Sequence, residues 1–156
     1  MDPVSSAASV LQLVQLATTL STLAFDLIRR FREAPEQLRN VASHLRMVQC
    51  QLELLSGLSS QLPSMLSPLS ALSPGEVKQL DEVFVGTCKI LENVRDSIVK
   101  QTLKTGKASK LMWVIRDEAG MKRIVARLRG TESSLNSIIL LLHTYVLSAI
   151  VLLISA

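Results

Sequence analysis

Both ends of this 156-residue chain lack charged side chains over a long stretch. No Asp, Glu, Lys or Arg occurs between Asp2 and Asp26, and none occurs after Glu132. In both stretches apolar residues recur at steps of three and four, which is the period of one helix face. A helix that is apolar on most of its sides is stable only when other helices or lipid cover it. The two ends therefore predict helices that need a partner, in a bundle or in a membrane.

The rest of the sequence also has the pattern of helices rather than strands. The chain is 48% hydrophobic but only 3% aromatic, and strand-forming residues do not alternate with a period of two. A chain of this length is long enough to bury a core of its own. The predicted fold class is all-α: a four-helix bundle with antiparallel packing, with or without one extra short helix in a connection. Residues 1–145 are assigned to the bundle and 146–156 to an apolar C-terminal extension of the last helix.

The first helix is expected to begin at Asp2-Pro3, because Asp caps helix N-termini and Pro fits the first helical position. Apolar residues cover more than half of its circumference, so it is either a central bundle helix or a helix that can enter a membrane. Interspersed Ser, Thr and Gln make residues 4–25 a poor match for a spanning helix, which favours the first interpretation. In the second interpretation the membrane-inserting residues are Val10, Leu11, Leu13, Val14, Leu16, Leu20 and Leu23.

Two amphipathic helices are expected in the middle of the chain. Pro at position 35 disfavours helix just before it, so the second helix is placed at about residues 35–58. A capping box at Ser73 and Glu76 begins the third helix, which is expected to run to about Leu103. The stretch between these two helices is rich in Pro and Ser and predicts a loop.

The last helix, from about Asp117, has the most regular pattern. Its apolar seam alternates steps of three and four, as in a heptad repeat. The seam consists of Met121, Ile124, Leu128, Thr131, Leu135, Ile138, Leu142, Tyr145, Ala149 and Leu152. Beyond Glu132 the other faces become apolar as well. The 22 residues from Leu135 to Ala156 carry no charge, and about 20 apolar residues suffice to cross a bilayer, so a C-terminal membrane anchor is an alternative prediction.

Positive charge is concentrated between Arg95 and Arg129, where ten Lys and Arg outnumber three Asp and Glu. A solvated helix face is the commonest cause of such a cluster. An anionic membrane surface is the next interpretation, because basic residues beside an apolar helix favour it. Nucleic acid is disfavoured, since there is no recognition motif and few aromatic residues are present to stack on bases. The residues assigned to an anionic-surface patch are Lys104, Lys107, Lys110, Lys122 and Arg123.

No sequence pattern indicates catalysis, a metal or a cofactor. His44 and His143 have no second ligand at metal-binding spacing, and His44 is expected to be a solvated residue. Nucleophile-elbow and phosphate-loop motifs are absent from the sequence. Cys50 and Cys88 are expected to be buried free thiols, which fits a reducing, cytoplasmic compartment. The expectation is a non-enzyme without a small-molecule substrate, in the cytoplasm, with or without attachment to a membrane.

The order of motifs is similar to that of a known family, the fungal N-terminal domain of STAND proteins, or Helo-like family. Its domain also occurs in proteins named after an azaphilone pigment cluster protein. The resemblance extends through Trp113 and the last helix to roughly Leu142. The segments that carry it are Met1-Asp2-Pro3-Val4-Ser5, the small-residue apolar helix 7–23, Phe25-Asp26, and Ala34-Pro35-Glu36-Gln37-Leu38-Arg39-Asn40 leading into a long leucine helix.

The resemblance implies a HeLo-like bundle at the front of fungal NOD-like receptors, related to HeLo cell-death modules. Such modules oligomerise and expose an N-terminal apolar helix to membranes, which here would be Val4 to Phe25. The function expected is a non-catalytic signalling module of the cell-death or heterokaryon-incompatibility type, which self-associates or binds another helical domain and engages membranes. The alternatives are a soluble adaptor bundle without membrane activity and a protein anchored by its C-terminal stretch.

Overall fold

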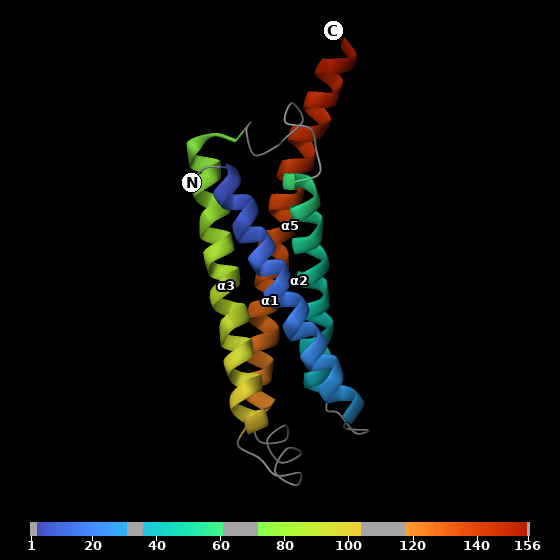
Figure 1. Ribbon diagram of the computed structural model, residues 1–156, viewed down its shortest axis with the longest axis vertical. Coiled ribbons are helices and arrows are strands. Elements are labelled where there is room, and N and C mark those ends of the chain that lie inside the picture. Colours follow the sequence, from blue (N-terminus) through green and yellow to red (C-terminus); the bar gives the residue numbers. More distant parts are fainter. Residues whose placement is uncertain (1–2, 31–35, 61–71, 104–117, 156) are drawn as a thin grey trace.

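The computed structural model describes residues 3–30, 36–60, 72–103 and 118–155. These residues form four α-helices: α1 (Pro3–Arg30), α2 (Glu36–Ser60), α3 (Pro74–Leu103) and α5 (Glu118–Ser155). The described ranges contain no strand. Figure 1 shows an elongated bundle from which the end of α5 projects. The all-α helical bundle that the sequence predicts is therefore confirmed, whereas the extra short helix would fall outside the described residues.

The contacts between helices define the arrangement of the bundle. α1 packs mainly on α2 and α3, and α5 also packs mainly on α2 and α3, so α1 and α5 occupy opposite corners. Successive helices alternate in direction along the long axis (Figure 1). The pairs α1·α2 and α3·α5 are therefore antiparallel, whereas α1·α3 and α2·α5 run parallel. The expected antiparallel packing holds only for α1·α2 and α3·α5. The reason is that α2 and α3, which follow one another in the chain, occupy opposite corners of the bundle instead of packing side by side.

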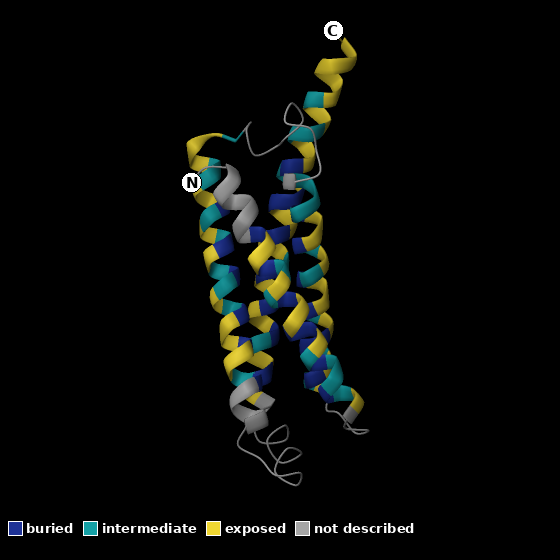
Figure 2. Cartoon of the chain, viewed as in Figure 1, coloured by how far each residue is buried: buried dark blue, intermediate teal, exposed yellow. Residues whose placement is uncertain are grey.

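The core runs the length of the bundle and is built mainly from leucine. Figure 2 shows buried residues on the inward sides of the helices and exposed residues on the outward sides. Every one of the four helices contributes at least one large, fully buried side chain, so no described helix is peripheral. These side chains are Leu20, Leu38, Leu45, Leu52, Leu55, Leu91, Leu128, Leu135, Leu142, Val48 and Val94.

α1 uses its apolar stripe inside the bundle. Most of the residues that the sequence assigns to membrane insertion are buried or half-buried, and only Leu11 is exposed. The buried ones are Val10, Leu13 and Leu20, and the half-buried ones are Val14, Leu16 and Leu23. The side chains that would enter a membrane are thus the ones that hold α1 in the bundle.

The two cysteines are free but are not buried as expected. Cys50 is exposed and Cys88 is half-buried. The core positions of this part of α2 are Val48, Leu52 and Leu55, and Cys50 lies between them in sequence on the outer face of the helix. Burial raises the pKa of the Cys88 thiol, and the neighbouring Glu92 carboxylate raises it further.

Candidate functional site

α5 leaves the bundle near Leu142, which is the last buried residue among the described ones. The residues after it, 143–155, continue as regular helix. At 1.5 Å per residue these 13 residues extend about 20 Å. Figures 1 and 2 show this segment projecting past the other helices with exposed residues along its length. We call residues 143–155 the tip of α5.

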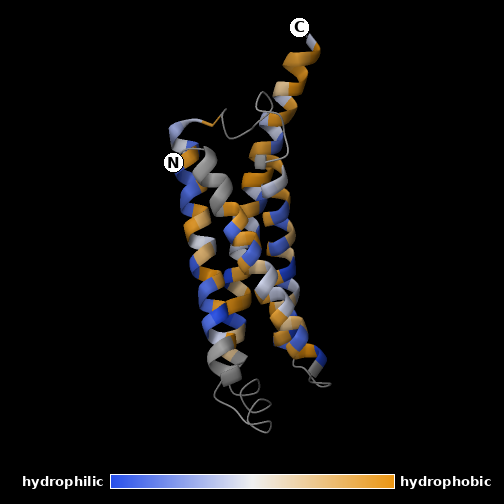
Figure 3. Ribbon diagram, viewed as in Figure 1, coloured by the Kyte–Doolittle hydropathy of each residue, from blue (hydrophilic) through white to orange (hydrophobic). Residues whose placement is uncertain are grey.

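The tip is apolar on all sides and carries no Lys, Arg, Asp or Glu. Figure 3 shows that hydrophobic residues dominate the projecting segment. Soluble monomers rarely expose a contiguous apolar surface of this kind, so the tip needs a covering partner. Six of its large aliphatic side chains are between 37% and 79% exposed: Leu147, Ile150, Val151, Leu152, Leu153 and Ile154.

Two helices are long and apolar enough to cross a membrane by length and composition. An 18-residue window within Val10–Arg29 has a mean hydropathy of 1.4 and is 33% buried, and a window of the same length within Ala119–Ser155 has a mean hydropathy of 2.5 and is 11% buried. The first is a core helix of the bundle, which passes the same test. The tip alone is too short for a hydrocarbon layer of about 30 Å, which takes about 20 residues. Because Ile138, Ile139 and Leu142 pack in the bundle, the folded tip can enter a bilayer without crossing it.

A hydrogen-bonded junction holds the base of the tip to the start of α3. The Tyr145 hydroxyl donates to Glu76 Oε1 at 2.8 Å and lies 3.0 Å from Oε2. Glu76 also forms the capping box that the sequence predicts, since its amide donates to Ser73 Oγ and its carboxylate accepts from the Ser73 amide. The Ser73 backbone bond and then the Tyr145 hydroxyl lower the pKa of Glu76. The same hydroxyl–carboxylate bond raises the pKa of Tyr145.

This junction is expected to contribute to stability only within a pH window. The folded pKa of Glu76 lies below its ordinary 4.5, so its contribution is present at neutral pH and is lost as the pH falls below about 4.5. The pKa of Tyr145 lies above its ordinary 10.0, so the unfolded state loses that proton first and stability falls as the pH rises past about 10. In thermal unfolding, the midpoint temperature of Glu76→Gln should lie below that of the wild type, and the difference should be constant from about pH 6 to about pH 9. If the midpoints of the two proteins differ by the same amount at about pH 3, the charged carboxylate of Glu76 is not the cause of the difference.

A second polar contact joins α5 to α2 below the tip. His44 Nδ1 hydrogen-bonds the Glu132 carboxylate, and His44 Nε2 accepts from Arg129 Nε at 3.5 Å. Gln51 Nε2 donates to the Glu132 backbone carbonyl at 3.0 Å. The His44 and Glu132 side chains are only about one-fifth exposed. His44 is therefore an interhelical contact and not the solvated residue expected, because α5 packs against its side of α2.

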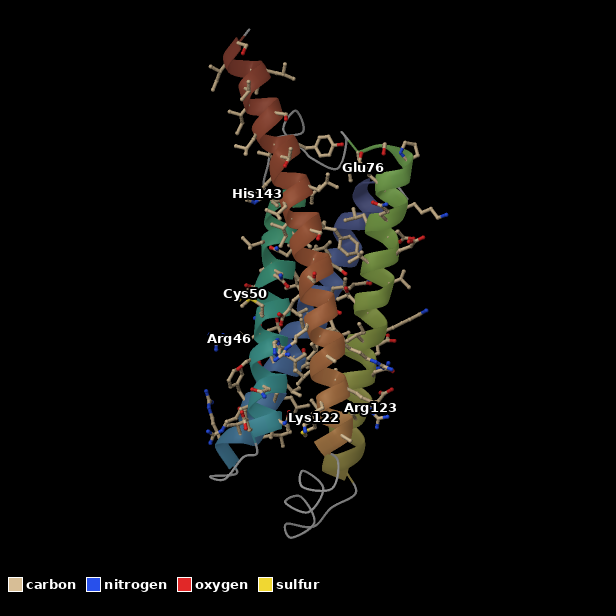
Figure 4. All side chains as sticks on the ribbon, turned by 180° about the vertical axis from the view of Figure 1, so that it is seen from behind. Arg46, Cys50, Glu76, Lys122, Arg123 and His143 are labelled. Carbon is tan, nitrogen blue, oxygen red and sulfur yellow. The ribbon has the colours of Figure 1, made fainter. Side chains whose placement is uncertain are left out.

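The residues assigned to an anionic-surface patch do not lie beside the tip. Lys122 and Arg123 are exposed near the start of α5, and Figure 4 shows them at the opposite end of the bundle from the tip. Lys104, Lys107 and Lys110 fall outside the described residues. His143 follows Lys122 by 21 residues, which places them about 32 Å apart along the helix. That distance exceeds the Debye length of about 8 Å, so Lys122 does not assist a tip inserted along the helix axis.

An open groove runs along the face between α3 and α5. Residues 79–90 of α3 and 127–141 of α5 line it, and the lining includes Gly86 and Gly130. A Cβ added at either glycine would meet no atom within 4 Å. The volume of about 810 Å³ is within the range of ligand pockets, but the groove lies open along the surface. Among the described residues, no three His, Cys, Asp or Glu side chains are grouped so that they could hold a metal ion.

Comparison with known proteins finds no matching family model, no matching curated protein and no matching solved structure. The resemblance to the Helo-like family accordingly stays a prediction. The sequence assigns the membrane-inserting residues to α1 and gives the C-terminal stretch, Leu135 to Ala156, only as an alternative anchor. The signal for the tip was present, since the heptad seam continues past Leu142 while the chain carries no charge after Glu132.

Proposed function

We propose that this protein is a non-catalytic interaction module whose helical bundle is held at a membrane surface by the tip of α5. The observation that carries this proposal is the projecting, charge-free tip with its six exposed aliphatic side chains. Burying one such side chain fully contributes about 1.5–3 kcal/mol, so six contribute on the order of 9 kcal/mol before partial burial and immobilisation reduce the sum. A single myristoyl chain, with a partition constant of about 10⁴ M⁻¹, already gives marginal binding.

The tip supports membrane contact better than α1 does, because the tip is already exposed. Release of α1 would uncover Val10, Leu13, Leu20 and Leu27, each less than 6% exposed in the bundle. At about 1.5–3 kcal/mol for each side chain, this release costs roughly 6 kcal/mol or more before lipid covers α1 again. The free, exposed Cys50 thiol supports a reducing, cytoplasmic location for the bundle.

Vesicle co-sedimentation tests the proposal. We expect the wild-type chain to sediment with vesicles of neutral phosphatidylcholine as well as with vesicles containing anionic lipid, since apolar burial needs no lipid charge. Val151→Asp with Ile154→Asp should reduce the bound fraction at least about tenfold, because each charge opposes burial in hydrocarbon. Both positions are exposed within one chain, so the far-ultraviolet circular dichroism and the unfolding midpoint of the monomer should stay unchanged.

A charge-reversal pair, Lys122→Glu with Arg123→Glu, provides the matched control. Both residues are exposed at the far end of α5, so the variant should bind neutral and anionic vesicles as the wild type does. Absence of binding of the wild-type monomer to either vesicle would overturn the proposal. So would binding that needs anionic lipid and is abolished by the charge reversal.

A further inference from the structure

The tip and the groove are neighbouring segments of the same helix and have nearly the same length. The groove takes residues 127–141 of α5, the tip comprises residues 143–155, and Leu142 lies between them. At 1.5 Å per residue each segment extends about 20 Å. The α3 side of the groove, residues 79–90, spans a similar length.

The chemistry of the two segments is also complementary. The groove lining combines apolar side chains such as Val83, Ile90 and Ile138 with Thr and Ser hydroxyls, and the open glycines 86 and 130 let another helix approach closely. Charged groups of the groove, Glu82 and Arg127, stand on exposed positions. An uncharged, aliphatic helix therefore fits this lining without leaving a charge unpaired in the contact.

The helix face that leads from the groove continues into the tip. Leu141 lines the groove, and Tyr145, Ser148 and Leu152 follow it at steps that keep one face of a helix. Beyond Tyr145 this face is exposed at Ser148 and at Leu152, which is 72% exposed. The tip thus presents an unpartnered face on the same side of α5 as the groove.

From this placement we propose that two copies of this chain form a two-fold dimer in which each tip lies in the α3·α5 groove of the other. The α5 helices run antiparallel, and the two-fold axis passes near Leu142, so that position 149 of one copy lies opposite about position 135 of the other. Such an isologous contact closes on itself and covers both tips at once. This symmetry requires a groove and a tip of nearly equal length on either side of one residue. The chain has both, at residues 127–141 and 143–155 on either side of Leu142, so we infer that the occupant is a second copy.

The dimer and the membrane-bound state compete for the same surface. A tip that lies in the partner's groove is not available to lipid, and a tip in lipid leaves the groove open. This competition rests on the proposed function, whereas the dimer itself does not. Filling the groove should therefore weaken the dimer and strengthen vesicle binding by the linkage between the two equilibria.

Sedimentation equilibrium in lipid-free buffer tests the dimer with Gly86→Leu combined with Gly130→Leu. Both substitutions place a side chain in the open groove and raise helix propensity, so the monomer fold is kept. We expect the dimer dissociation constant to rise at least about tenfold. The control Asn136→Leu adds the same side chain to α5 at an exposed position outside the groove and should leave the constant unchanged. A wild-type monomer at about 100 μM would overturn the dimer, and so would a groove-filled variant as dimeric as wild type.

Disulfide trapping tests the register. In a Cys50→Ser, Cys88→Ser background, Ser134→Cys with Ala149→Cys should oxidise to a covalent dimer. The two positions are 15 residues apart on one helix, about 22 Å, so they cannot bridge within a chain when a disulfide needs Cα atoms closer than about 7 Å. A control pair replaces Ser134→Cys by Asn136→Cys, at nearly the same height outside the groove. Equal trapping of both pairs would overturn the register.

Vesicle binding of the groove-filled variant separates the two proposals. If this variant binds neutral vesicles more strongly than wild type, by about the factor lost in dimerisation, both proposals stand. If disulfide-trapped dimers form but neither the wild type nor the groove-filled variant binds vesicles, the proposed function is overturned and the dimer proposal stands. Vesicle binding by a wild type that stays monomeric would overturn the dimer and leave the proposed function.

Discussion

Leu20→Asp is expected to unfold the bundle, whereas Leu11→Asp on the same helix is expected to be tolerated. Leu20 is 1% exposed and Leu11 is 50% exposed. A carboxylate at position 20 would have no partner, and an unpaired buried charge costs several kcal/mol even after the protein relaxes. Together with the lost Leu packing, the penalty is about 5 kcal/mol or more, which is comparable to the total stability of a domain, about 5–15 kcal/mol.

Circular dichroism at increasing urea concentration measures this contrast. We expect Leu20→Asp to show little helix at any concentration, and Leu11→Asp to unfold within about 0.5 kcal/mol of wild type. The two variants also test which helix contacts lipid, because Leu11 and Leu20 are both among the α1 residues that the sequence assigns to membrane insertion. A folded Leu20→Asp variant that loses vesicle binding would move the membrane contact from the tip of α5 to α1.

Leu135→Ala is expected to destabilise the bundle strongly, whereas Leu152→Ala on the same helix should leave its stability unchanged. Leu135 is fully buried and Leu152 is 72% exposed. Truncating a buried leucine to alanine costs about 2.7–5 kcal/mol, because apolar burial is lost and a cavity is left. For a protein of this size the loss corresponds to a fall in Tm of roughly 10 °C. At an exposed position the change is within about 0.5 kcal/mol.

In vesicle binding the order is reversed: Leu152→Ala should bind more weakly than wild type, whereas Leu135→Ala should not. Leu152→Ala removes apolar surface from the tip, and each lost methylene weakens burial in lipid by about 0.8 kcal/mol. Leu135→Ala, measured below its unfolding temperature, should bind as wild type does. A large loss of stability in Leu152→Ala, measured at a protein concentration where the chain is monomeric, would mean that the bundle extends further along α5 than residue 142.

Several features could be predicted from the sequence because they depend on residues near one another in the chain. The helices follow from apolar residues at steps of three and four, and the start of α3 follows from the Ser73 and Glu76 capping pair. The buried side of α5 follows its heptad seam from Met121 to Leu142. These patterns set local conformation and the preferred side of each helix, whatever the neighbouring helices are.

The tertiary structure alone decided which apolar surfaces are covered. The sequence favours a packed bundle helix at the first charge-free end, and at the last end it leaves open whether the apolar stretch is covered or anchored. The structure packs α1 among its neighbours, whereas α5 extends past the other helices. The order of helices around the bundle brings His44 to Glu132 and Tyr145 to Glu76, contacts between residues far apart in the chain. It also turns Cys50 outward and leaves the α3·α5 groove open. Periodicity identifies the face of a helix that prefers burial, but the lengths and positions of the other helices determine how much of that face they cover.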